Sequence, residues 1–420
     1  ILLYYVGTSE YGIYQLIGSF IAYFGVMDFG LTASIIRFYS KYRVLKDNIN
    51  MENILAISMR LYMFITVILI IMGSVYIFFD KIFLYSMTQS EIYLAKRIMI
   101  LLIINVVINM MTMIFRAIIN AYEKFLILKG LETVQLILQP LFVILILQEY
   151  PSAFSVALVQ TILNSILAIV RIYYCFVVLN VKIKYHYYDK KLFSDFGKLS
   201  LSVFLVTLID QVFFKTNQII LGAIEGAVAV AVYSIAAIIY TNYMQMSNAI
   251  SGVYLPHITG LVIKNNQGKE ISNLFINIGR WQYFLLAAIG SGFFIFGEDF
   301  INLWAGMGFE DAYWITLLII VPFTIDLIQN IGLAILQAQN KYDFRAKVYF
   351  CMGIFNLCLA IPLAKKYGGI GCAFATGLSM FIGNGLIMNW YYLKITKLEI
   401  GRFWKNIGKI TIGVVIITII

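Results

Sequence analysis

The chain has 420 residues, of which 61% are hydrophobic and only 12% are Asp, Glu, Lys or Arg, and its mean hydropathy is +0.87. A soluble domain carries about 25% charged residues, so this composition excludes a cytosolic enzyme and a secreted disulfide scaffold. The net charge of +10 does not indicate nucleic-acid binding, because excess Lys and Arg in an apolar chain is typical of cytoplasmic loops between membrane spans. The composition predicts an all-α polytopic membrane protein.

Apolar windows of about 19 residues predict twelve membrane spans, most of them long enough to cross the hydrocarbon core of a bilayer. The triplet Asp28-Phe29-Gly30 interrupts the first span. Because Ile1 is not Met and both chain ends lie within apolar runs, we expect a fragment that lacks the first helix and the C-terminal end. In chain order the predicted spans are 12–38, 58–79, 98–119, 126–147, 153–179, 199–221, 228–254, 275–297, 314–337, 346–364, 369–393 and 403–420.

Lys and Arg gather in alternate connections between these spans. By the positive-inside rule, the connections rich in Lys and Arg face the cytoplasm. This orientation puts Ile1 outside and predicts that an odd number of spans precedes it. The connections that hold most of the 31 Lys and Arg residues are 37–57, 115–130, 171–198, 255–280, 338–347 and 393–409.

The two halves of the sequence resemble each other at a nearly constant offset. Residues 11–17 match 230–236, and residues 119–125 match 336–342. Both copies run in the same direction, which predicts two helical bundles related by an axis along the membrane normal. We expect an N-terminal bundle at 1–181 without its first helix, a cytoplasmic linker at 182–198, a C-terminal six-helix bundle at 199–393, and the start of an additional C-terminal region at 394–420.

Polar side chains repeat on one face of the span 98–119, where Asn105, Asn109, Thr112, Arg116 and Asn120 follow at steps of three and four. The span 314–337 carries Asp326, Gln329, Asn330 and Gln337. The repeat pairs Asn109 with Asp326 and Thr112 with Gln329. Two interpretations remain open: hydrogen bonds that join helices, or a hydrated central cavity, which the repetition and the charges favour. The span 153–179 adds Gln160, Asn164 and Arg171 on a loosely shared face.

Charged residues within spans are costly, at about 2.5–3.5 kcal/mol or more at a helix centre. Asp210 and Lys215 lie near the middle of their span, five positions apart, so they do not face each other. Each is either part of a structural salt bridge or part of a substrate or ion site. Arg37, Arg116 and Arg171 lie near cytoplasmic ends, where snorkelling explains each one alone; together they could form a basic mouth for a phosphate.

The sequence lacks the patterns of several other functions. The four cysteines have no metal-ligand spacing, and there is no phosphate-binding glycine loop. We therefore expect no cofactor and no ATP hydrolysis. The outside loops are short, and their acidic clusters are Glu298-Asp299 and Glu310-Asp311, which disfavours a membrane-embedded polymerase or acyltransferase.

Six short stretches carry a resemblance to a known family: 7–14, 27–31, 37–40, 116–124, 218–222 and 366–371. They resemble the polysaccharide biosynthesis flippases of bacteria, the Wzx-type transporters of O-antigen and capsule repeat units. The resemblance covers nearly the whole chain and extends to the multidrug/oligosaccharidyl-lipid/polysaccharide exporter superfamily. It implies two six-helix bundles of the MATE-like fold in the bacterial plasma membrane. It also implies that a polyprenyl-pyrophosphate-linked oligosaccharide moves from the cytoplasmic to the outer leaflet by alternating access, for the synthesis of O-antigen of lipopolysaccharide, capsule or another surface polysaccharide.

The implied substrate gives the polar residues their predicted roles. Lys215, Arg37 and Arg116 would bind phosphate, whereas Asn109, Thr112, Gln329 and Asn330 would contact the glycan. Asp210 and Asp326 would couple transport to Na⁺ or H⁺. Membrane lipid and other polysaccharide assembly proteins are the further expected partners. One alternative is a multidrug/cation antiporter of the same fold, whose cavity should be acidic; the other is the polymerase or acyltransferase.

Overall fold

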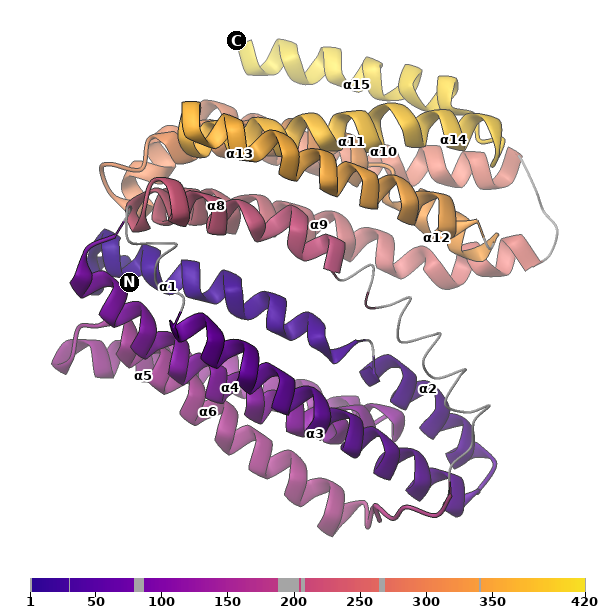
Figure 1. Cartoon of the computed structure of the whole chain (residues 1–420). Helices are drawn as coiled ribbons and strands as arrows, with labels where there is room; N and C mark the ends of the chain where they lie inside the picture. Colours follow the sequence, from indigo (N-terminus) through magenta and orange to yellow (C-terminus); the bar gives the residue numbers. More distant parts are fainter. Residues whose placement is uncertain are drawn as a thin grey trace. The chain divides into compact units, whose positions relative to one another are not determined.

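The computed structural model describes residues 2–29, 31–78, 87–187, 204, 208–263, 269–339 and 341–419. Every regular element within these ranges is a helix, which confirms the predicted all-α fold class (Figure 1). The chain forms two compact units, one of Ile1–Gln211 with Gly226–Val228, and one of Val212–Glu225 with Ala229–Ile420. Most of the predicted linker 182–198 lies outside the described residues.

Unit 1 is built around one long central helix, α4 (Gln89–Ala121), which contacts each of the other α-helices of this unit. Buried Ile114 and Ile118 of α4 pack with Ile35 and Tyr62 in its apolar core. The other elements are α1 (Leu2–Gly25), η1 (Val26–Asp28), α2 (Leu31–Val44), α3 (Asn48–Phe78), α5 (Phe125–Glu149), α6 (Ala153–Tyr173) and η3 (Tyr174–Val178).

The first predicted span is broken at Asp28, as the sequence suggested. Helix α1 ends in the short turn η1, and Phe29 follows with a left-handed φ of 49°. The Asp28 carboxylate accepts hydrogen bonds from the Tyr62 hydroxyl at 2.6 Å and from Thr32 Oγ1 at 3.0 Å. The Thr32 amide in the first turn of α2 also donates to this carboxylate, at 3.4 Å, and an acidic group beside a helix N-terminus is favourable because the free N–H groups there carry partial positive charge.

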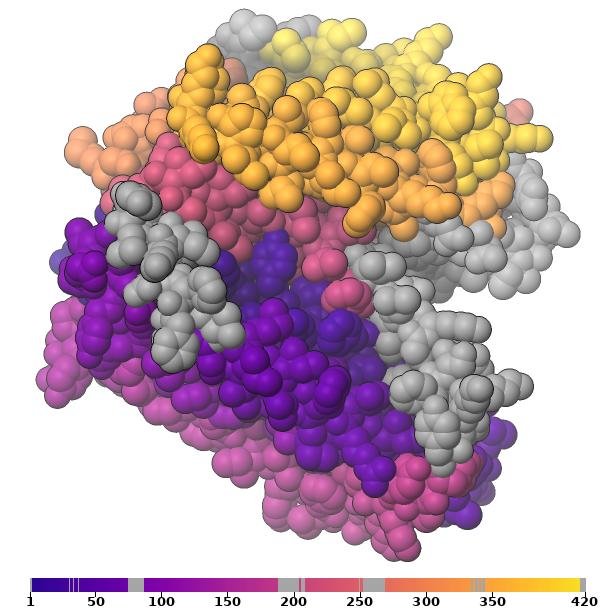
Figure 2. Space-filling view, viewed as in Figure 1, coloured from indigo at the N-terminus to yellow at the C-terminus, as the bar shows by residue number. Residues whose placement is uncertain are grey.

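Unit 2 contains α8 (Thr216–Ile224), α9 (Ala227–Ile263), α10 (Lys269–Ala305), α11 (Asp311–Leu327), α12 (Asn330–Ala338), α13 (Tyr342–Met380), the π-helix η4 (Phe381–Ile387), α14 (Met388–Lys394) and α15 (Ile400–Ile419). Figure 2 shows the side chains of α13 on the visible face of this unit. Phe350, Ile354 and Ile361 of α13 are exposed, which is the pattern of a helix that faces lipid. Helix α15 packs on α10 through fully buried Phe403, whose ring lies against Gly279.

Seven stretches of the described residues are long and apolar enough to cross a membrane: Asn48–Ser74, Gln89–Ala121, Phe125–Glu149, Ala153–Val178, Ala227–Asn248, Lys269–Ala305 and Phe344–Lys394. Several of the twelve predicted spans are not separate continuous helices. The span 314–337 is divided between α11 and α12, and 199–221 is interrupted by a turn at Lys215. Conversely, 346–364 and 369–393 run together across a kink at Gly368, where φ is +57°.

The same backbone turn recurs in both units at the offset of the sequence repeat. The Lys124 amide donates to the Ile119 carbonyl at 3.2 Å, and the Lys341 amide donates to the Leu336 carbonyl at 2.8 Å. Both lysines occupy the N-cap position of the following helix, Lys124 before α5 and Lys341 before α13, and neither makes a side-chain capping hydrogen bond. Both pairs of positions are related by the offset that the sequence motifs predict, so the repeat extends to local hydrogen bonding.

Candidate functional site in the N-terminal unit

A polar cavity of about 620 Å³ lies among α1, α4, α5 and α6. Helix α4 contributes Asn105, Asn109, Thr112 and Arg116; α5 contributes Glu132, Gln135 and Gln139; and α6 contributes Gln160, Asn164 and Arg171. Within each helix these positions follow at steps of three, four or seven, so each set lies on one helical face. The cavity therefore brings together three of the predicted site residues, Asn109, Thr112 and Arg116.

Side-chain amides form a connected network across this cavity. Buried Asn105 is its centre, because its Oδ1 accepts from Asn109 Nδ2 at 2.8 Å and from Asn164 Nδ2 at 3.1 Å. Asn105 Nδ2 donates to Thr161 Oγ1 at 3.3 Å, and Gln135 Nε2 donates to Asn164 Oδ1 at 2.7 Å. The network joins α4, α5 and α6, so the same residues join helices and line this cavity of unit 1, while a hydrated central cavity stays a prediction.

Thr112 differs from the amides of this network. Its hydroxyl donates to the Ile108 carbonyl of its own helix at 2.8 Å, which occupies its only proton. At the other side of the cavity, the Tyr14 hydroxyl donates to Gln160 Oε1 at 2.8 Å. Free hydrogen-bonding capacity toward a ligand is therefore greatest at the side-chain amides, each of which has more than one donor or acceptor.

The charged groups of the cavity lie together at one end of it. Arg116 Nη2 forms an ion pair with Glu132, and Lys129 Nζ lies 2.8 Å from the second oxygen of the same carboxylate. Arg171 also lines the cavity, with only 8% of its surface exposed, and its buried Nε has no hydrogen-bond partner. Among the described residues, this end of the cavity is lined by two cations, Arg116 and Arg171, and one carboxylate, Glu132, while Lys129 contacts that carboxylate from outside the lining.

The predicted site residues of unit 2 form a separate cluster around the turn between α11 and α12. Asp326 lies 3.8 Å from Arg345, at the start of α13. Buried Gln329 donates to Asn389 Oδ1 at 2.9 Å, and the Trp404 indole donates to the same oxygen at 2.9 Å. Asn330 pairs instead with Asn248 of α9, donating to Oδ1 at 2.7 Å.

The structure describes Lys215, Asp210 and Arg37, the three other predicted site residues, mainly through their places along the chain. Lys215 occupies the turn just before α8, and among the described residues its ammonium makes no ion pair. Asp210 lies in the helical stretch 208–214 that precedes this turn, and it has interaction partners of its own. The backbone of Arg37 belongs to α2, but its side chain lies outside the described residues. Their functional roles remain predictions.

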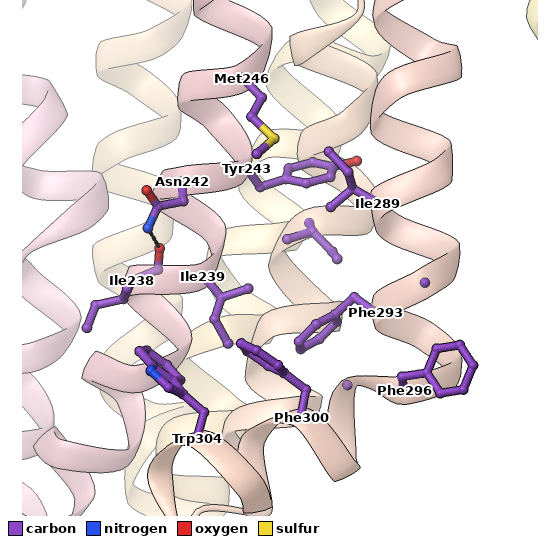
Figure 3. Close-up of a pocket in the computed structure, with 13 residues that line it drawn as sticks. Ile238, Ile239, Asn242, Tyr243, Met246, Ile289, Phe293, Phe296, Phe300 and Trp304 are labelled. Carbon is purple, nitrogen blue, oxygen red and sulfur yellow. Dashed lines mark hydrogen bonds between the residues drawn. The ribbon is translucent and has the colours of Figure 1, made fainter. Parts of the chain in front are cut away.

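An apolar cavity of about 430 Å³ lies among α9, α10 and α11 of unit 2. Figure 3 shows Phe293, Phe300 and Trp304 gathered at one end of this cavity, and Met246 and Tyr243 at the other. Asn242 also lines this cavity, and its side-chain amide donates to the Ile238 carbonyl of the same helix at 2.8 Å. The lining suits a hydrocarbon and offers a glycan few hydrogen bonds.

Sequence reasoning missed Glu132, Gln135 and Gln139 on α5, and Arg345, Asn389 and Trp404 in unit 2. The α5 residues follow at steps of three and four within an otherwise apolar helix, and this spacing was the available signal. Asn389 and Trp404 belong to α14 and α15, and no sequence pattern connects them to Gln329, because their meeting depends on tertiary packing.

Comparison with solved structures identifies the fold. The lipid II flippase MurJ in its inward closed conformation superposes with a TM-score of 0.75 at 18% identity, covering 100% of this chain and 88% of the other. An inward-facing multidrug resistance transporter of the MATE family gives a TM-score of 0.69 at 13% identity, covering 96% of each chain. At these identities the likeness shows the fold alone, and it confirms the MATE-like architecture.

Sequence comparison identifies relatives that are named as transporters or flippases. A Shigella flexneri protein whose name assigns it to O-antigen transport is 23% identical over 405 residues, which covers 93% of this chain and 91% of the relative. A Haloferax volcanii protein, named as a flippase of low-salt glycan biosynthesis, is 22% identical over 210 residues, or 50% of this chain and 44% of the relative. A family model described as "Polysaccharide biosynthesis protein" matches residues 1–262. The chain therefore belongs to the polysaccharide biosynthesis protein family.

Proposed function

We propose that this protein is a flippase that moves a polyprenyl-pyrophosphate-linked oligosaccharide from the cytoplasmic to the outer leaflet of the bacterial plasma membrane. The names of its sequence relatives support transport of this class of molecule. The single structural observation that carries the proposal is the amide-lined cavity of unit 1, which combines hydrogen-bonding side chains with an excess of positive charge.

Each part of such a substrate has a chemical counterpart in the protein. Amide groups can donate to and accept from sugar hydroxyls, and Asn105, Asn164 and Gln135 provide them on three helices. Arginine suits phosphate because its planar guanidinium donates several parallel hydrogen bonds. Apolar cavities and lipid-facing helices can accommodate the polyprenyl chain. These features bind and orient a substrate, and alternating access would then carry it across without a chemical reaction.

Ion exchange is the energy source that we propose, with Asp326 as the first candidate for coupling and Asp210 as the second. Asp326 lies in the last turn of α11, before the helix break, 3.8 Å from Arg345. A carboxylate whose pairing changes as it binds Na⁺ or H⁺ can shift the balance between two conformations only if the ion binds one of them more tightly. Transport that responds to neither a Na⁺ gradient nor a pH gradient would contradict this part of the proposal.

Complementation provides the test of the function. The gene is expressed in a bacterial strain that makes the lipid-linked repeat unit but lacks its own repeat-unit flippase, and surface polysaccharide is measured. We expect the wild-type chain to restore the polysaccharide. Asn105→Leu should abolish this restoration while leaving protein abundance in the membrane nearly unchanged.

Asn406→Leu is the matched control, since the Asn406 side chain bonds only to the Arg402 carbonyl of its own helix among the described contacts and lines neither of the two cavities. It should restore surface polysaccharide as the wild type does. Failure of the wild-type chain at normal abundance in the membrane, while lipid-linked oligosaccharide accumulates in the cytoplasmic leaflet, would contradict the proposed function.

The second candidate is a multidrug or cation antiporter, favoured by the structural likeness to the MATE transporter. A site for organic cations should be acidic, whereas the charged end of the unit 1 cavity is lined by Arg116 and Arg171 with a single carboxylate, Glu132. Expression in a drug-sensitive strain separates the two functions. Resistance to cationic dyes without restoration of surface polysaccharide would favour the antiporter.

A further inference from the structure

Arg171 is a buried charged residue that forms no ion pair among the described residues. It belongs to the last turn of α6, and only 8% of its surface is exposed. Its Nε has no hydrogen-bond partner, and no carboxylate among the described residues lies within ion-pair distance of its guanidinium. A snorkelling arginine would hold its guanidinium in water, so this degree of burial argues against the interpretation that suits a helix end.

The nearby carboxylate of Glu132 is already shared. One of its oxygens pairs with Arg116 and the other with Lys129. Arg116, Arg171 and Glu132 line the same cavity. A buried cation without its own counter-ion is costly, so this end of the cavity has room, in charge and in hydrogen bonds, for a second anion.

The chemistry of the two arginines favours a phosphate as that anion. Each guanidinium carries five N–H donors in a fixed fork, and one carboxylate offers only two oxygens, which Arg116 and Lys129 already occupy. A diphosphate offers more acceptor oxygens and more negative charge than a carboxylate does. Leu136, which also lines the cavity, is 75% exposed on α5, so an anion bound here could remain attached to a chain that lies in lipid.

We propose that Arg116 and Arg171 form a site for the diphosphate of the lipid-linked substrate, and that Glu132 is an internal anion which the diphosphate displaces from Arg116. This inference rests on the proposed function for the identity of the substrate. In the unoccupied site Glu132 neutralises Arg116. When the diphosphate enters, Glu132 keeps its contact with Lys129 and releases Arg116 to the ligand. Glu132 thereby lowers the affinity for the diphosphate, which aids its release after transport.

Binding to the purified full chain in detergent tests this site directly. Inorganic pyrophosphate is titrated calorimetrically into the wild type and into the variants Arg171→Gln, Arg171→Lys, Arg116→Gln and Glu132→Gln. We expect Arg171→Gln and Arg116→Gln to weaken binding by at least about tenfold, the effect of losing one charge-assisted hydrogen bond. Arg171→Lys should retain part of the affinity, and Glu132→Gln should increase it, because the competing negative charge is gone.

Arg43→Gln is the matched control, because Arg43 forms an ion pair with Glu123 outside this cavity. It should leave pyrophosphate binding unchanged. The elution profile and melting temperature of each variant show whether it is folded, and Arg171→Lys preserves the charge if Arg171→Gln does not fold. Sodium glucuronate, tested in parallel, separates a phosphate from the carboxylate of an acidic sugar.

Three results would overturn the proposal: no pyrophosphate binding by the folded wild type, equal binding by the wild type and both Arg171 variants, or a preference for glucuronate. Unchanged or weaker binding by Glu132→Gln would overturn the role of Glu132. These results are separable from failure of the proposed function. If the wild type restores surface polysaccharide but binds pyrophosphate independently of Arg171, only this inference fails. If binding depends on Arg171 but no glycan is exported, the anion site stands and the flippase function fails.

Discussion

The Tyr62 hydroxyl donates a hydrogen bond of 2.6 Å to the Asp28 carboxylate, and this contact joins α3 to the break between α1 and α2. Thr32 Oγ1 lies 3.0 Å from both the Asp28 carboxylate and the Tyr62 hydroxyl. The three polar groups satisfy one another where the helix is interrupted. A break in a membrane span persists when side chains or neighbouring helices bind the freed backbone groups, and Asp28 lies next to those of α2.

Tyr62→Phe is expected to destabilise this break. The substitution removes one donor to a partly buried carboxylate, a loss of about 1–3 kcal/mol, and the melting temperature in detergent should fall. Tyr173→Phe is the control, since Tyr173 is exposed, and it should leave the melting temperature unchanged. If the two variants melt alike, the Tyr62–Asp28 hydrogen bond contributes nothing measurable to stability.

Asp326→Asn should destabilise unit 2 more than the double substitution Asp326→Asn/Arg345→Met does. The single change removes the carboxylate and leaves the Arg345 charge in place, whereas replacing both partners removes the cost of burying it. Thermal unfolding of the three proteins provides the comparison. A double variant less stable than the single one would show that Arg345 stabilises the unit mainly through its other contacts.

Gly279→Ala should weaken the packing of α15 on α10. A Cβ at this position would lie 2.5 Å from the Phe403 ring and 2.8 Å from the Ile328 carbonyl oxygen, and such overpacking costs about 1–3 kcal/mol. Limited proteolysis near residues 395–400 should become faster. Gly401→Ala, where a Cβ meets nothing within 4 Å, should not accelerate cleavage; equal rates for both variants would contradict the predicted clash.

The loop before α3 is expected to lose stability in acid. Hydrogen bonds from the Asn50 backbone and side chain, at 3.1 and 2.6 Å, lower the pKa of Asp47 below its ordinary value of 3.8. A lowered folded-state pKa stabilises the protein above the unfolded-state pKa, and the stabilisation is lost as pH falls through the folded-state pKa. The difference in melting temperature between wild type and Asp47→Asn should therefore be present at pH 7 and shrink below about pH 4. A difference that does not vary with pH would contradict this linkage.

The helical fold and part of the candidate site followed from sequence patterns. Composition predicted the helices, and the spacing of Asn105, Asn109, Thr112 and Arg116 predicted one polar face of α4, because helical periodicity depends only on local geometry. The turn at Lys124 and Lys341 also followed the predicted repeat. These features need no knowledge of which helices are neighbours.

The features of the fold and of the candidate site that the sequence did not predict depend on tertiary packing. Hydropathy averages over a window, so it joined α11 to α12 across the break at Ile328 and Gln329, and it gave no weight to Glu132 among the apolar residues of α5. The interpretation of Arg171 as a helix-end cation was reasonable for its position, but burial of its side chain can be learned only from the surrounding helices. The pairing of Asp326 with Arg345 was missed for the same reason.

Trp404 gives this protein a natural optical reporter. Its indole N–H shares the Asn389 oxygen with Gln329, so the additional helix α15 and the turn between α11 and α12 are joined through a single acceptor. A rearrangement that turns Gln329 away would change the polarity around the indole. In a variant that retains Trp404 as its single tryptophan, with Trp281, Trp304, Trp314 and Trp390 replaced by Phe, the emission wavelength should therefore shift when this turn rearranges, without any attached dye.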